Sequence, residues 1–542
     1  MSTVRPMLTI LTCILLIIVS PQSNAEPELF SDLLVYGGTA AGTMAAYSAA
    51  RQGSRVTLLE PGGHLGGMVT GGLSATDLGD DRIIGGYARM YYRRVAEHYG
   101  WRDLAQPSSW LSEPHVAEQV FDDMLREAGV RVIFHARVRE RNGVGVQDHR
   151  IVHLITEDER IWRSQLFVDA SYNGDVLSQS GAGYTWGRES SNTYGESLGG
   201  VRAMTPQHQF AWPILAYRDD HHLYPEISDG PLGAAGSGDR KVQAYNFRLI
   251  LTDDPANRLP LPKPDGYDAA QFALLAKYLK EFEGHLGREP RLWDFFMPVR
   301  IPNHKADFNN NGPISTDYIG HSSAYPDATY DEKRQIRDDH LRYTQSLLYF
   351  LAHDPAVPTR LRNEIGSWGL AKDEFEDTGH WPRELYIREG RRMIGTYILT
   401  QADLQDRRTK WDSIGMGAYN SDAHNVQRIA MPDGSVRNEG DMQVPVSPYE
   451  IPYRAITPRS NEVKNLLVPV CLSASHVAYA SLRMEPQFMI IGQAAGVAAA
   501  LAVRDRRPVQ DIDVAKLQHE LRKTRAVLSL GDEGASNRLP PD

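Results

Sequence analysis

Short apolar runs and a small-residue helix mark the first part of this chain as a βαβ unit. Residues 33–36 and 56–59 are apolar, which is typical of strands buried on both faces of a parallel sheet. The alanine-rich stretch between them predicts a helix thin enough to pack on that sheet. The same kinds of pattern predict further strands over 130–135 and 165–170, and further helices over 86–98 and 115–128.

The pattern changes after about residue 190. Polar, aromatic and proline-rich stretches replace the alternation of strands and helices, and one long amphipathic helix is predicted over 331–353. The alternation returns with a strand over 465–470 and an apolar, small-residue helix over 486–501. The length of that helix, with Gln487 and Gln493 inside it, favours burial in the protein over a membrane span.

The turn between the first strand and the first helix is rich in glycine. Glycine permits a tight turn, and the N-terminus of the following helix can direct free N–H groups at a phosphate. The second strand ends at Glu60, whose carboxylate is placed to accept hydrogen bonds from ribose hydroxyls. This order predicts a dinucleotide-binding unit, with Thr39 where the fingerprint has its middle glycine. The residues of the turn predicted to bind the cofactor are Gly37, Gly38, Thr39, Ala41 and Gly42.

A second glycine-rich stretch follows directly after Glu60. Six glycines fall between residues 61 and 72, so neither a helix nor a regular strand is expected there. The stretch predicts a wide loop whose backbone can lie against a flat ligand.

Residues 1–25 have the pattern of a secretory signal peptide. Arg5 precedes an apolar stretch over 7–19, and small residues offer a cleavage site near Ala25. The apolar stretch is short for a membrane span, so no stable span is expected in the mature chain. The pattern predicts a periplasmic or secreted protein, with an uncleaved anchor as the alternative.

Charge and cysteine content narrow the chemistry. The net charge of −10, without a basic stretch interleaved with aromatic residues, argues against nucleic-acid binding. Cys13 lies in the predicted signal, so the mature chain keeps Cys471 alone and lacks the thiolates of an iron–sulfur cluster or an internal disulfide. No H-E-x-x-H motif occurs, and no metal site is predicted.

Together these motifs resemble the FAD-dependent oxidoreductase family, flavoproteins with two dinucleotide-binding domains that are grouped with heterodisulfide reductase A-like proteins. The resemblance extends over residues 32–501. It implies an FAD cofactor and an α/β fold, in which a discontinuous Rossmann-like FAD-binding domain carries an inserted α+β substrate or cap domain. Beyond the glycine turn, the stretches that carry the resemblance are 65–73 with Thr76-Asp77, 243–248, 472–476 and 483–486.

The resemblance implies further cofactor contacts, in which His64, Gly66, Gly67 and Met68 line the pyrophosphate or the flavin. Asp169 and Ala170 stand where the family has a turn that touches FAD, with Tyr172 in place of a common glycine. The helix that begins near Pro486 would direct its positive N-terminus at the flavin, and Gly492 would allow a close approach. The expected segments are a signal peptide over 1–25, the FAD-binding domain over 26–195 and 441–505, the substrate domain over 196–440, and a C-terminal helix and tail over 506–542.

Flavin oxidation of a C–H bond beside a hydroxyl or amine requires a base on the heteroatom, and histidine is the usual choice. His424 lies in a polar, glycine-containing stretch, and His476 lies just before the predicted flavin helix, so these are the candidate bases. Asn425 and Arg483 complete the predicted catalytic set, because Arg483 can pair with the flavin or a substrate anion. Each histidine can instead be structural, and Arg483 can simply pair with Glu485.

The sequence thus predicts a secreted FAD-dependent oxidoreductase. It would move hydride from a small polar substrate, carbohydrate or polyol, to flavin N5 and pass the electrons to an acceptor that the sequence does not identify. The aromatic and polar content of the middle segment favours a sugar, and Asn303, His304, Lys305 and Asp307 suit hydroxyl binding or else cap a turn. The alternatives are a flavin-dependent lyase or hydrolase acting on polysaccharide through transient redox chemistry, and an electron carrier without substrate chemistry.

Overall fold

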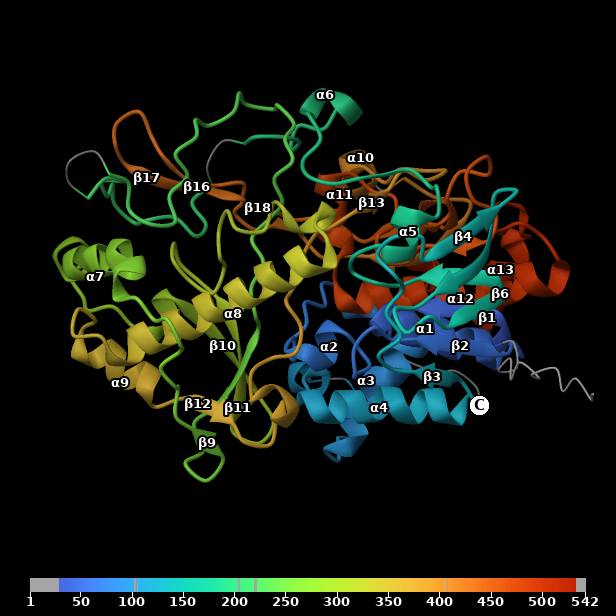
Figure 1. The fold of residues 1–542 in the computed structure, drawn as a ribbon, viewed down its shortest axis with the longest axis horizontal. Helices are drawn as coiled ribbons and strands as arrows, with labels where there is room; N and C mark the ends of the chain where they lie inside the picture. Colours follow the sequence, from blue (N-terminus) through green and yellow to red (C-terminus); the bar gives the residue numbers. More distant parts are fainter. Residues whose placement is uncertain are drawn as a thin grey trace, which may run out of the picture.

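The computed structural model of the protein describes residues 29–532 apart from 102, 103, 105, 203, 204, 219–221 and 407. The predicted signal peptide, residues 1–25, and the end of the tail, residues 533–542, lie outside the described residues. The described chain forms two regions side by side, one built on a largely parallel sheet and one on an antiparallel sheet (Figure 1).

The first sheet has the strand order β3-β2-β1-β6-β5-β4, with β20 also paired to β6. β1, β2, β3, β6 and β20 pair in parallel, whereas β4 and β5 form a hairpin that joins β6 in antiparallel pairing. Because β20 comes late in the chain, this pairing confirms the predicted discontinuous dinucleotide-binding fold. The strands are β1 (Leu29–Tyr36), β2 (Val56–Leu59), β3 (Arg131–Ile133), β4 (Val144–Gln147), β5 (Arg150–Ile155), β6 (Ile161–Asp169) and β20 (Leu466–Leu467).

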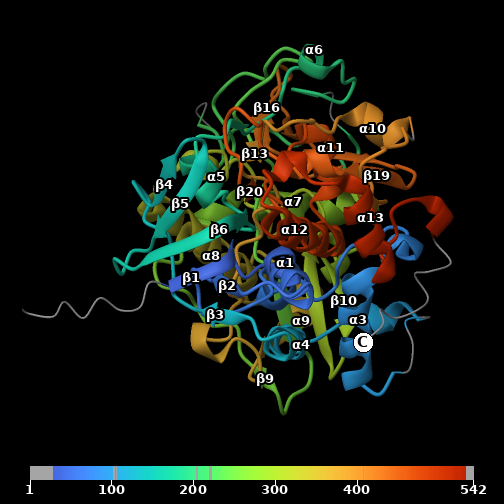
Figure 2. The ribbon, with the colours of Figure 1, turned by 90° about the vertical axis from the view of Figure 1, so that its right-hand side faces the viewer.

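Helices cover one face of this sheet. Leu33 and Val35 of β1 point into the core that these helices form, while Leu34 and Tyr36 belong to a separate core on the other face. Figure 2 shows α1 and α12 side by side against the sheet. The helices of this region are α1 (Ala40–Arg51), α2 (Met68–Gly71), α3 (Gly86–His98), α4 (Pro114–Glu127), α5 (Asp175–Gln179), α6 (Ser191–Tyr194), α10 (Gln401–Gln405), α11 (His476–Leu482), α12 (Glu485–Asp505) and α13 (Val514–Lys523).

Small residues let α12 pack directly on α1. A Cβ added to Gly492 would lie 2.2 Å from the Ala41 carbonyl oxygen, and one added to Gly496 would lie 2.1 Å from that of Ala45. α12 is long and apolar enough to cross a membrane, yet 94% of its apolar window is buried inside the protein. The sequence prediction of a buried helix agrees with this position in the core.

The second region is an antiparallel sheet flanked by long helices. Its strand order is β10-β11-β8-β12-β9. The helix α8 runs from this region to the edge of the parallel sheet, and its N-terminal end lies nearer that sheet (Figure 1). The elements are β8 (Leu249–Thr252), β9 (Arg258–Leu259), β10 (Phe296–Ile301), β11 (Lys305–Asn310), β12 (Gly369–Ala371), α7 (Ala273–Leu286), α8 (Tyr330–His353) and α9 (Thr359–Gly366).

Four two-stranded ladders lie outside the two main sheets in the described part of the chain. β14 pairs with β19, and Ile414 and Met416 of β14 belong to the same core as α12. Part of the segment before residue 440 therefore packs with the parallel region, and the predicted domain boundaries stay a prediction. The ladders are β7 (Tyr184–Thr185) with β13 (Arg392–Met393), β14 (Ser413–Gly417) with β19 (Tyr449–Pro452), β15 (Ser421–Ala423) with β18 (Met442–Val444), and β16 (Gln427–Ala430) with β17 (Val436–Glu439).

One sequence expectation is wrong within the second glycine-rich stretch. Four of its residues form the short helix α2, although no helix was expected there. Gly66 and Gly67 adopt positive φ angles of 92° and 55° and turn the chain sharply. The Thr70 hydroxyl then donates to the Leu65 carbonyl and closes the helical turn.

Candidate functional site

The glycine turn between β1 and α1 is shaped by contacts that exclude larger side chains. Gly37 has a φ of +92°, and a Cβ on it would lie 2.8 Å from the Ser171 nitrogen. A Cβ on Gly42 would lie 1.8 Å from the Gly37 carbonyl oxygen. The backbone can turn this tightly only because both positions are glycine.

Thr39 takes the place of the middle fingerprint glycine without disturbing the turn. It adopts a φ of −63° and a ψ of 173°, which any residue can adopt, and it is the N-cap of α1. Its hydroxyl accepts a hydrogen bond from the Gly42 amide at 3.2 Å and donates one to the Ala170 carbonyl at 2.8 Å. The threonine therefore satisfies a free N–H group of α1 and ties the turn to the end of β6.

Glu60 lies at the end of β2, as the sequence predicted. Its Oε2 accepts a hydrogen bond from the Gly38 amide at 2.6 Å, and its Oε1 accepts one from the Gly62 amide at 2.5 Å. Burial raises the pKa of Glu60 to about 8, although the two amides act in the opposite direction. The carboxyl group is thus held at the mouth of the glycine turn by the backbone of both glycine-rich stretches.

A cavity of about 410 Å³ lies at the carboxyl ends of β1 and β2. In open α/β sheets this edge is where ligands bind. Residues that the sequence did not suggest complete its wall, among them Arg137, Asn173, Tyr325, Tyr330 and Lys333. The predicted cofactor residues that line it are Gly37, Thr39, Glu60, His64 and Gly67.

His64 lies in the cavity wall, and each of its ring nitrogens contacts a carboxylate. Its Nδ1 lies 2.7 Å from Glu118 Oε1, and its Nε2 lies 2.9 Å from Asp377 Oδ2. Asp377 follows β12 in the antiparallel region. His64 therefore bridges the two regions. The ring can contact a cofactor through its face, while its nitrogens hold the wall in place.

The remaining predicted cofactor residues do not line the cavity. Asp169 is fully buried, and its Oδ2 accepts hydrogen bonds from the Val176 and Leu177 amides at 2.9 and 2.7 Å. It therefore anchors the start of α5, a different role from the predicted cofactor contact. The others that do not line the cavity are Gly38, Ala41, Gly42, Gly66, Met68, Ala170 and Gly492, and Gly492 serves the packing of α12 on α1.

Tyr172 links the cavity to the start of α12. Its hydroxyl donates to Glu485 Oε1 at 2.7 Å and accepts a hydrogen bond from the Met68 amide at 2.9 Å. Glu485 is 1% exposed, and burial raises its pKa to about 8. The tyrosine in place of a family glycine thus joins the second glycine-rich stretch to the helix predicted to face the flavin.

The antiparallel region contributes cations to this cavity. Lys333, Arg334 and Arg337 come from the first two turns of α8 and line the wall. The sequence contains a signal for this group of cations, because basic residues at i, i+1 and i+4 lie close together on one side of a helix. The sequence analysis places the whole helix in the substrate domain and does not predict that its N-terminal turns line this cavity.

The residues present fit FAD. The cavity combines a glycine turn at the N-terminus of a buried helix, an acidic side chain at the end of the second strand, and several cations. These are the groups that bind the pyrophosphate and ribose of a dinucleotide. The buried Asn173 Oδ1 has no hydrogen-bond partner among the described residues, so it is free to accept one from a ligand.

A second cavity, of about 310 Å³, contains His424. Its Nδ1 lies 2.7 Å from Asp317 Oδ2, which assigns the ring proton to Nδ1 and leaves Nε2 as the acceptor. Burial lowers the pKa of His424 to about 4, and the nearby Arg388 acts in the same direction. Neutral amide side chains and one carboxylate are prominent in the wall, which includes Asn309, Asn310, Asn420, Gln443, Asp422 and Tyr419.

Asp317 is held between His424 and Arg388. Its Oδ1 lies 3.0 Å from Arg388 Nη1. Burial alone would raise the pKa of Asp317, but Arg388 and His424 outweigh it and lower that pKa to about 2. The carboxylate is therefore ionised and can stabilise a proton that His424 accepts.

Arg483 lies in the same polar cluster. Its guanidinium donates to the Tyr386 hydroxyl at 2.9 Å and to the Asp422 carbonyl at 2.8 Å. Arg388 and Arg483 both lie over the Tyr386 ring, at 4.8 and 5.7 Å from its centroid. The alternative pairing of Arg483 with Glu485 is not the arrangement found, because Glu485 bonds Tyr172 instead.

His476 is buried away from the second cavity. Its Nδ1 lies 2.8 Å from Glu389 Oε2, and its Nε2 has no hydrogen-bond partner among the described residues. Gln243 connects the two candidate histidines, because its Oε1 accepts from the His424 amide at 3.1 Å and its Nε2 donates to Glu389 at 3.3 Å. Asn425 is also buried, and its Oδ1 is likewise without a partner in the described part of the chain.

The polar residues around β11 serve structural ion pairs. Asp307 Oδ1 lies 2.9 Å from Arg248 Nε, and Asp307 Oδ2 accepts from the Ala75 amide at 2.8 Å. These bonds connect the stretches at 65–77 and 243–248 that carried the family resemblance. The hydroxyl-binding role considered for Asp307 is therefore replaced by a buried contact between the regions.

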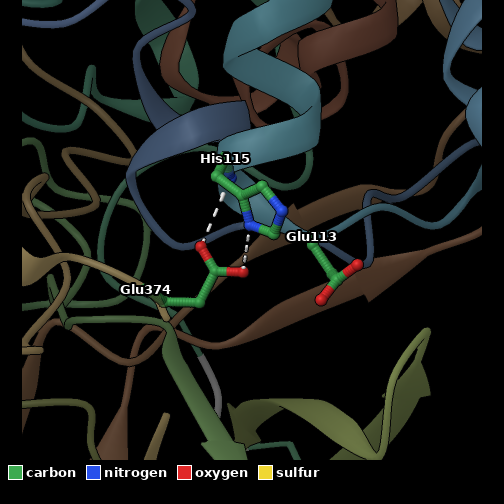
Figure 3. Close-up of side chains that lie close together, drawn as sticks. All are labelled: Glu113, His115 and Glu374. Carbon is green, nitrogen blue, oxygen red and sulfur yellow. Dashed lines mark hydrogen bonds and ion pairs between the residues drawn. The ribbon is translucent and has the colours of Figure 1, made fainter. Parts of the chain in front are cut away.

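Glu113, His115 and Glu374 converge with geometry that could hold a metal ion (Figure 3). The ammonium of Lys305 already lies among them, 2.6 Å from Glu113 Oε1 and 2.7 Å from Glu374 Oε1. Asn303 donates to Glu113 Oε2 at 2.7 Å. A lysine thus supplies the positive charge that the buried carboxylates need, and we assign this group as an ion cluster rather than a metal centre.

Comparison with known proteins identifies the family of the chain and its cofactor. A family model described as FAD dependent oxidoreductase matches residues 32–521. No curated protein matches the sequence.

Several solved flavoprotein structures are similar to part of the chain. A flavin monooxygenase variant from Stenotrophomonas maltophilia shares 17% identity over 30% of this chain and 42% of its own, with a TM-score of 0.20. NikD, an unusual amino acid oxidase essential for nikkomycin biosynthesis, shares 15% identity over 30% and 56%, with a TM-score of 0.23. L-amino acid deaminase from Proteus vulgaris shares 14% identity over 30% and 60%, with a TM-score of 0.22. The matches span less than two thirds of the length of each of these proteins.

Proposed function

Because the chain belongs to the FAD dependent oxidoreductase family, we propose that this FAD-dependent oxidoreductase is an exported enzyme that oxidises a neutral, hydroxyl-rich small molecule. A carbohydrate or polyol is the substrate class that we favour. The observation that carries the proposal is the cavity around His424, whose wall pairs a neutral histidine with a row of amide side chains. Amide groups both donate and accept hydrogen bonds, as hydroxyl groups do.

His424 is the proposed base for the substrate hydroxyl. Its pKa of about 4 keeps the imidazole neutral at pH 6 to 8, so Nε2 can accept the hydroxyl proton. Asp317 holds Nδ1 and stabilises the positive charge that the ring then acquires. When bound, FAD supplies a hydride acceptor for the C–H bond of the same carbon. The alcohol thereby loses a hydride and a proton and becomes a carbonyl group.

His476 and Asn425 remain predicted catalytic residues with less support. His476 is 1% exposed and does not line the cavity that holds His424. It touches that site through Gln243 and Glu389. We propose a positioning role for His476, and we favour His424 as the base.

The proposed location outside the cytoplasm rests on residues 1–25. Their charged start, apolar stretch and small residues near Ala25 form the pattern of a cleaved secretory signal. Expression of the full chain followed by N-terminal sequencing of the exported protein tests this. A new N-terminus close to residue 26 in the periplasmic or medium fraction is the expected result, and an intact N-terminus on a cytoplasmic protein would contradict it.

The substrate proposal is tested by anaerobic bleaching of the flavin band. Neutral sugars and polyols are expected to reduce the flavin, whereas amino acids and hydrophobic alcohols of similar size are not. His424→Gln should slow this reduction by about 10²- to 10⁴-fold while FAD remains bound. His476→Gln is the comparison, and we expect a smaller effect because that side chain lies outside the cavity.

The two alternatives give different results in the same assay. A flavin-dependent lyase would convert a polysaccharide with no external electron acceptor and no lasting bleaching. An electron carrier would be reduced by a protein donor and by none of the small molecules. Either result, with equal rates for wild type and His424→Gln, would overturn the proposed dehydrogenation.

A further inference from the structure

Lys333 is a buried cation at the cofactor cavity. The residue is 6% exposed, and it comes from the first turn of α8 in the antiparallel region. Its side chain lines the same cavity as Gly37 and Thr39 of the glycine turn. Among the described residues, no carboxylate lies within ion-pairing distance of its ammonium group.

The surroundings of Lys333 are aromatic, and none of the described carboxylates forms an ion pair with its ammonium group. Its Nζ lies 5.6 Å from the centre of the Tyr325 ring and 6.0 Å from that of Tyr330. Burial lowers the pKa of Lys333, and the negative charge of Asp175 acts in the opposite direction. Cation–π contacts offset part of the desolvation cost, yet a buried ammonium is stable only with a partner for its charge.

The two other cations of α8 at this cavity have contacts of their own. Arg334 lies 2.9 Å from Asp331 Oδ1, and Arg337 lies 3.3 Å from Asp338 Oδ1 and donates to the Arg383 carbonyl. Lys333 is thus the member of this set that has no ion pair among the described residues, and Asp175 and Asp327 act on its charge only from a greater distance. A ligand anion in the cavity would compensate it.

We propose that Lys333 pairs with the pyrophosphate of FAD and thereby fastens α8 of the antiparallel region to the dinucleotide-binding region. The pyrophosphate is the anionic part of FAD, and the glycine turn that binds such groups lies in the wall shared with Lys333. The inference rests on FAD as the cofactor and is independent of the substrate. This ion pair would couple the binding of FAD to the docking of α8 on the dinucleotide-binding region.

This coupling has a consequence for cofactor release. His64 and Lys333 approach the cavity from the two regions, and His64 is bonded to Asp377 of the antiparallel region. FAD bound between them would contact both. Loss of the cofactor therefore should loosen the N-terminal turns of α8 more than its distal end.

The test measures ligand binding to the apoprotein at low salt. Dissociation constants for FAD, ADP and riboflavin are determined by fluorescence for wild type, Lys333→Met and Lys333→Arg. Arg342→Met is the matched control, because Arg342 lies on the same helix, is exposed, and pairs with Asp339 away from the cavity. Hydrogen exchange of residues 330–337 is compared with and without FAD, and the Tm of each apoprotein is recorded.

Lys333→Met should weaken FAD and ADP binding by about ten- to hundredfold and leave riboflavin binding unchanged, because riboflavin lacks the pyrophosphate. Lys333→Arg should recover most of the affinity, and Arg342→Met should match wild type. The apoprotein Tm of Lys333→Met should stay the same or rise, since an unpaired buried ammonium is removed. FAD should protect residues 330–337 from exchange in wild type but not in Lys333→Met.

Two results would overturn the proposal. The first is a Lys333→Met variant whose dissociation constants for FAD and ADP lie within twofold of the wild-type values. The other is a parallel loss of FAD and riboflavin affinity together with a lower apoprotein Tm, which would show a structural role. Neither result depends on whether a sugar reduces the flavin. The Lys333 proposal can therefore be wrong while the substrate proposal is right, and the reverse.

Discussion

Glu485 should make the stability of the apoprotein depend on pH. The side chain lies in the first turn of α12, is 1% exposed, and accepts one hydrogen bond from Tyr172. Its Oε2 has no partner among the described residues. Burial therefore favours the protonated carboxyl group, and Glu485→Gln places a neutral side chain of the same shape at this position.

The magnitude follows from the pKa. The pKa of Glu485 rises from 4.5 to about 8 in the folded protein, and each pKa unit is worth about 1.4 kcal/mol. Between these two pH values the folded state binds more protons than the unfolded state, so stability falls as pH rises. The full effect on the free energy of unfolding is on the order of 5 kcal/mol, complete above about pH 8.

The assay is urea unfolding of the apoprotein at several values between pH 5 and pH 8. Wild type should lose stability with a slope steeper than that of Glu485→Gln by up to about 1.4 kcal/mol per pH unit. Glu97→Gln is the control, because Glu97 is exposed on α3 and its loss should leave the wild-type slope unchanged. Near pH 5 the wild type and Glu485→Gln should have similar stability.

Parallel stability curves for wild type and Glu485→Gln would refute this reasoning. They would mean that Glu485 is ionised in the folded protein at neutral pH, with a partner that the described contacts do not provide. A steeper slope for Glu485→Gln than for wild type would contradict even the sign of the argument.

Four further predictions test other parts of the structure. The rate of flavin reduction by substrate in wild type should be independent of His424 ionisation from pH 6 to 8 and fall as the pH approaches 4, because the protonated ring cannot accept a proton; stopped-flow rates across this range check it, and a fall centred near pH 7 would contradict it. Thr39→Ala should lower apoprotein stability by about 1 kcal/mol through loss of the α1 cap, with recovery in Thr39→Ser, as seen by urea unfolding. Gly42→Ala should purify without flavin, because its Cβ would meet the Gly37 carbonyl, so a normal visible spectrum would be evidence against the observed turn. Lys305→Met should destabilise the protein by about 3–5 kcal/mol, because it leaves Glu113 buried without the ammonium group and Glu374 with His115 alone; thermal unfolding checks it, and a Tm equal to that of wild type would contradict it.

The sequence predicted the local structure of the first βαβ unit, which depends on near neighbours in the chain. Gly37, Gly42 and Glu60 lie within one βαβ unit, and their roles follow from φ angles, spacing and strand ends. The family match confirms the FAD cofactor and the fold that they indicated. Even Thr39, which departs from the fingerprint, has a local explanation as an N-cap.

Residues that meet across long stretches of sequence were harder to predict. Asp169 looked like a cofactor ligand because of the motif around it, but its carboxylate is consumed by the amides of α5. Gly492 was expected to admit the flavin, whereas it admits the backbone of α1. A motif identifies a position in the chain, but the partner that a side chain reaches depends on how distant elements pack.

The sequence by itself determined the dinucleotide-binding unit, because hydrophobic pattern, glycine geometry and the end of a strand are local properties of the chain. Only the tertiary structure decided that His424 faces a cavity while His476 is buried beside Glu389, and that α8 brings Lys333 to the cavity beside the glycine turn. Those assignments depend on contacts between residues at least 87 positions apart in the sequence. Burial at such contacts sets both the direction of a side chain and its pKa, and neither is encoded in the spacing of neighbouring residues.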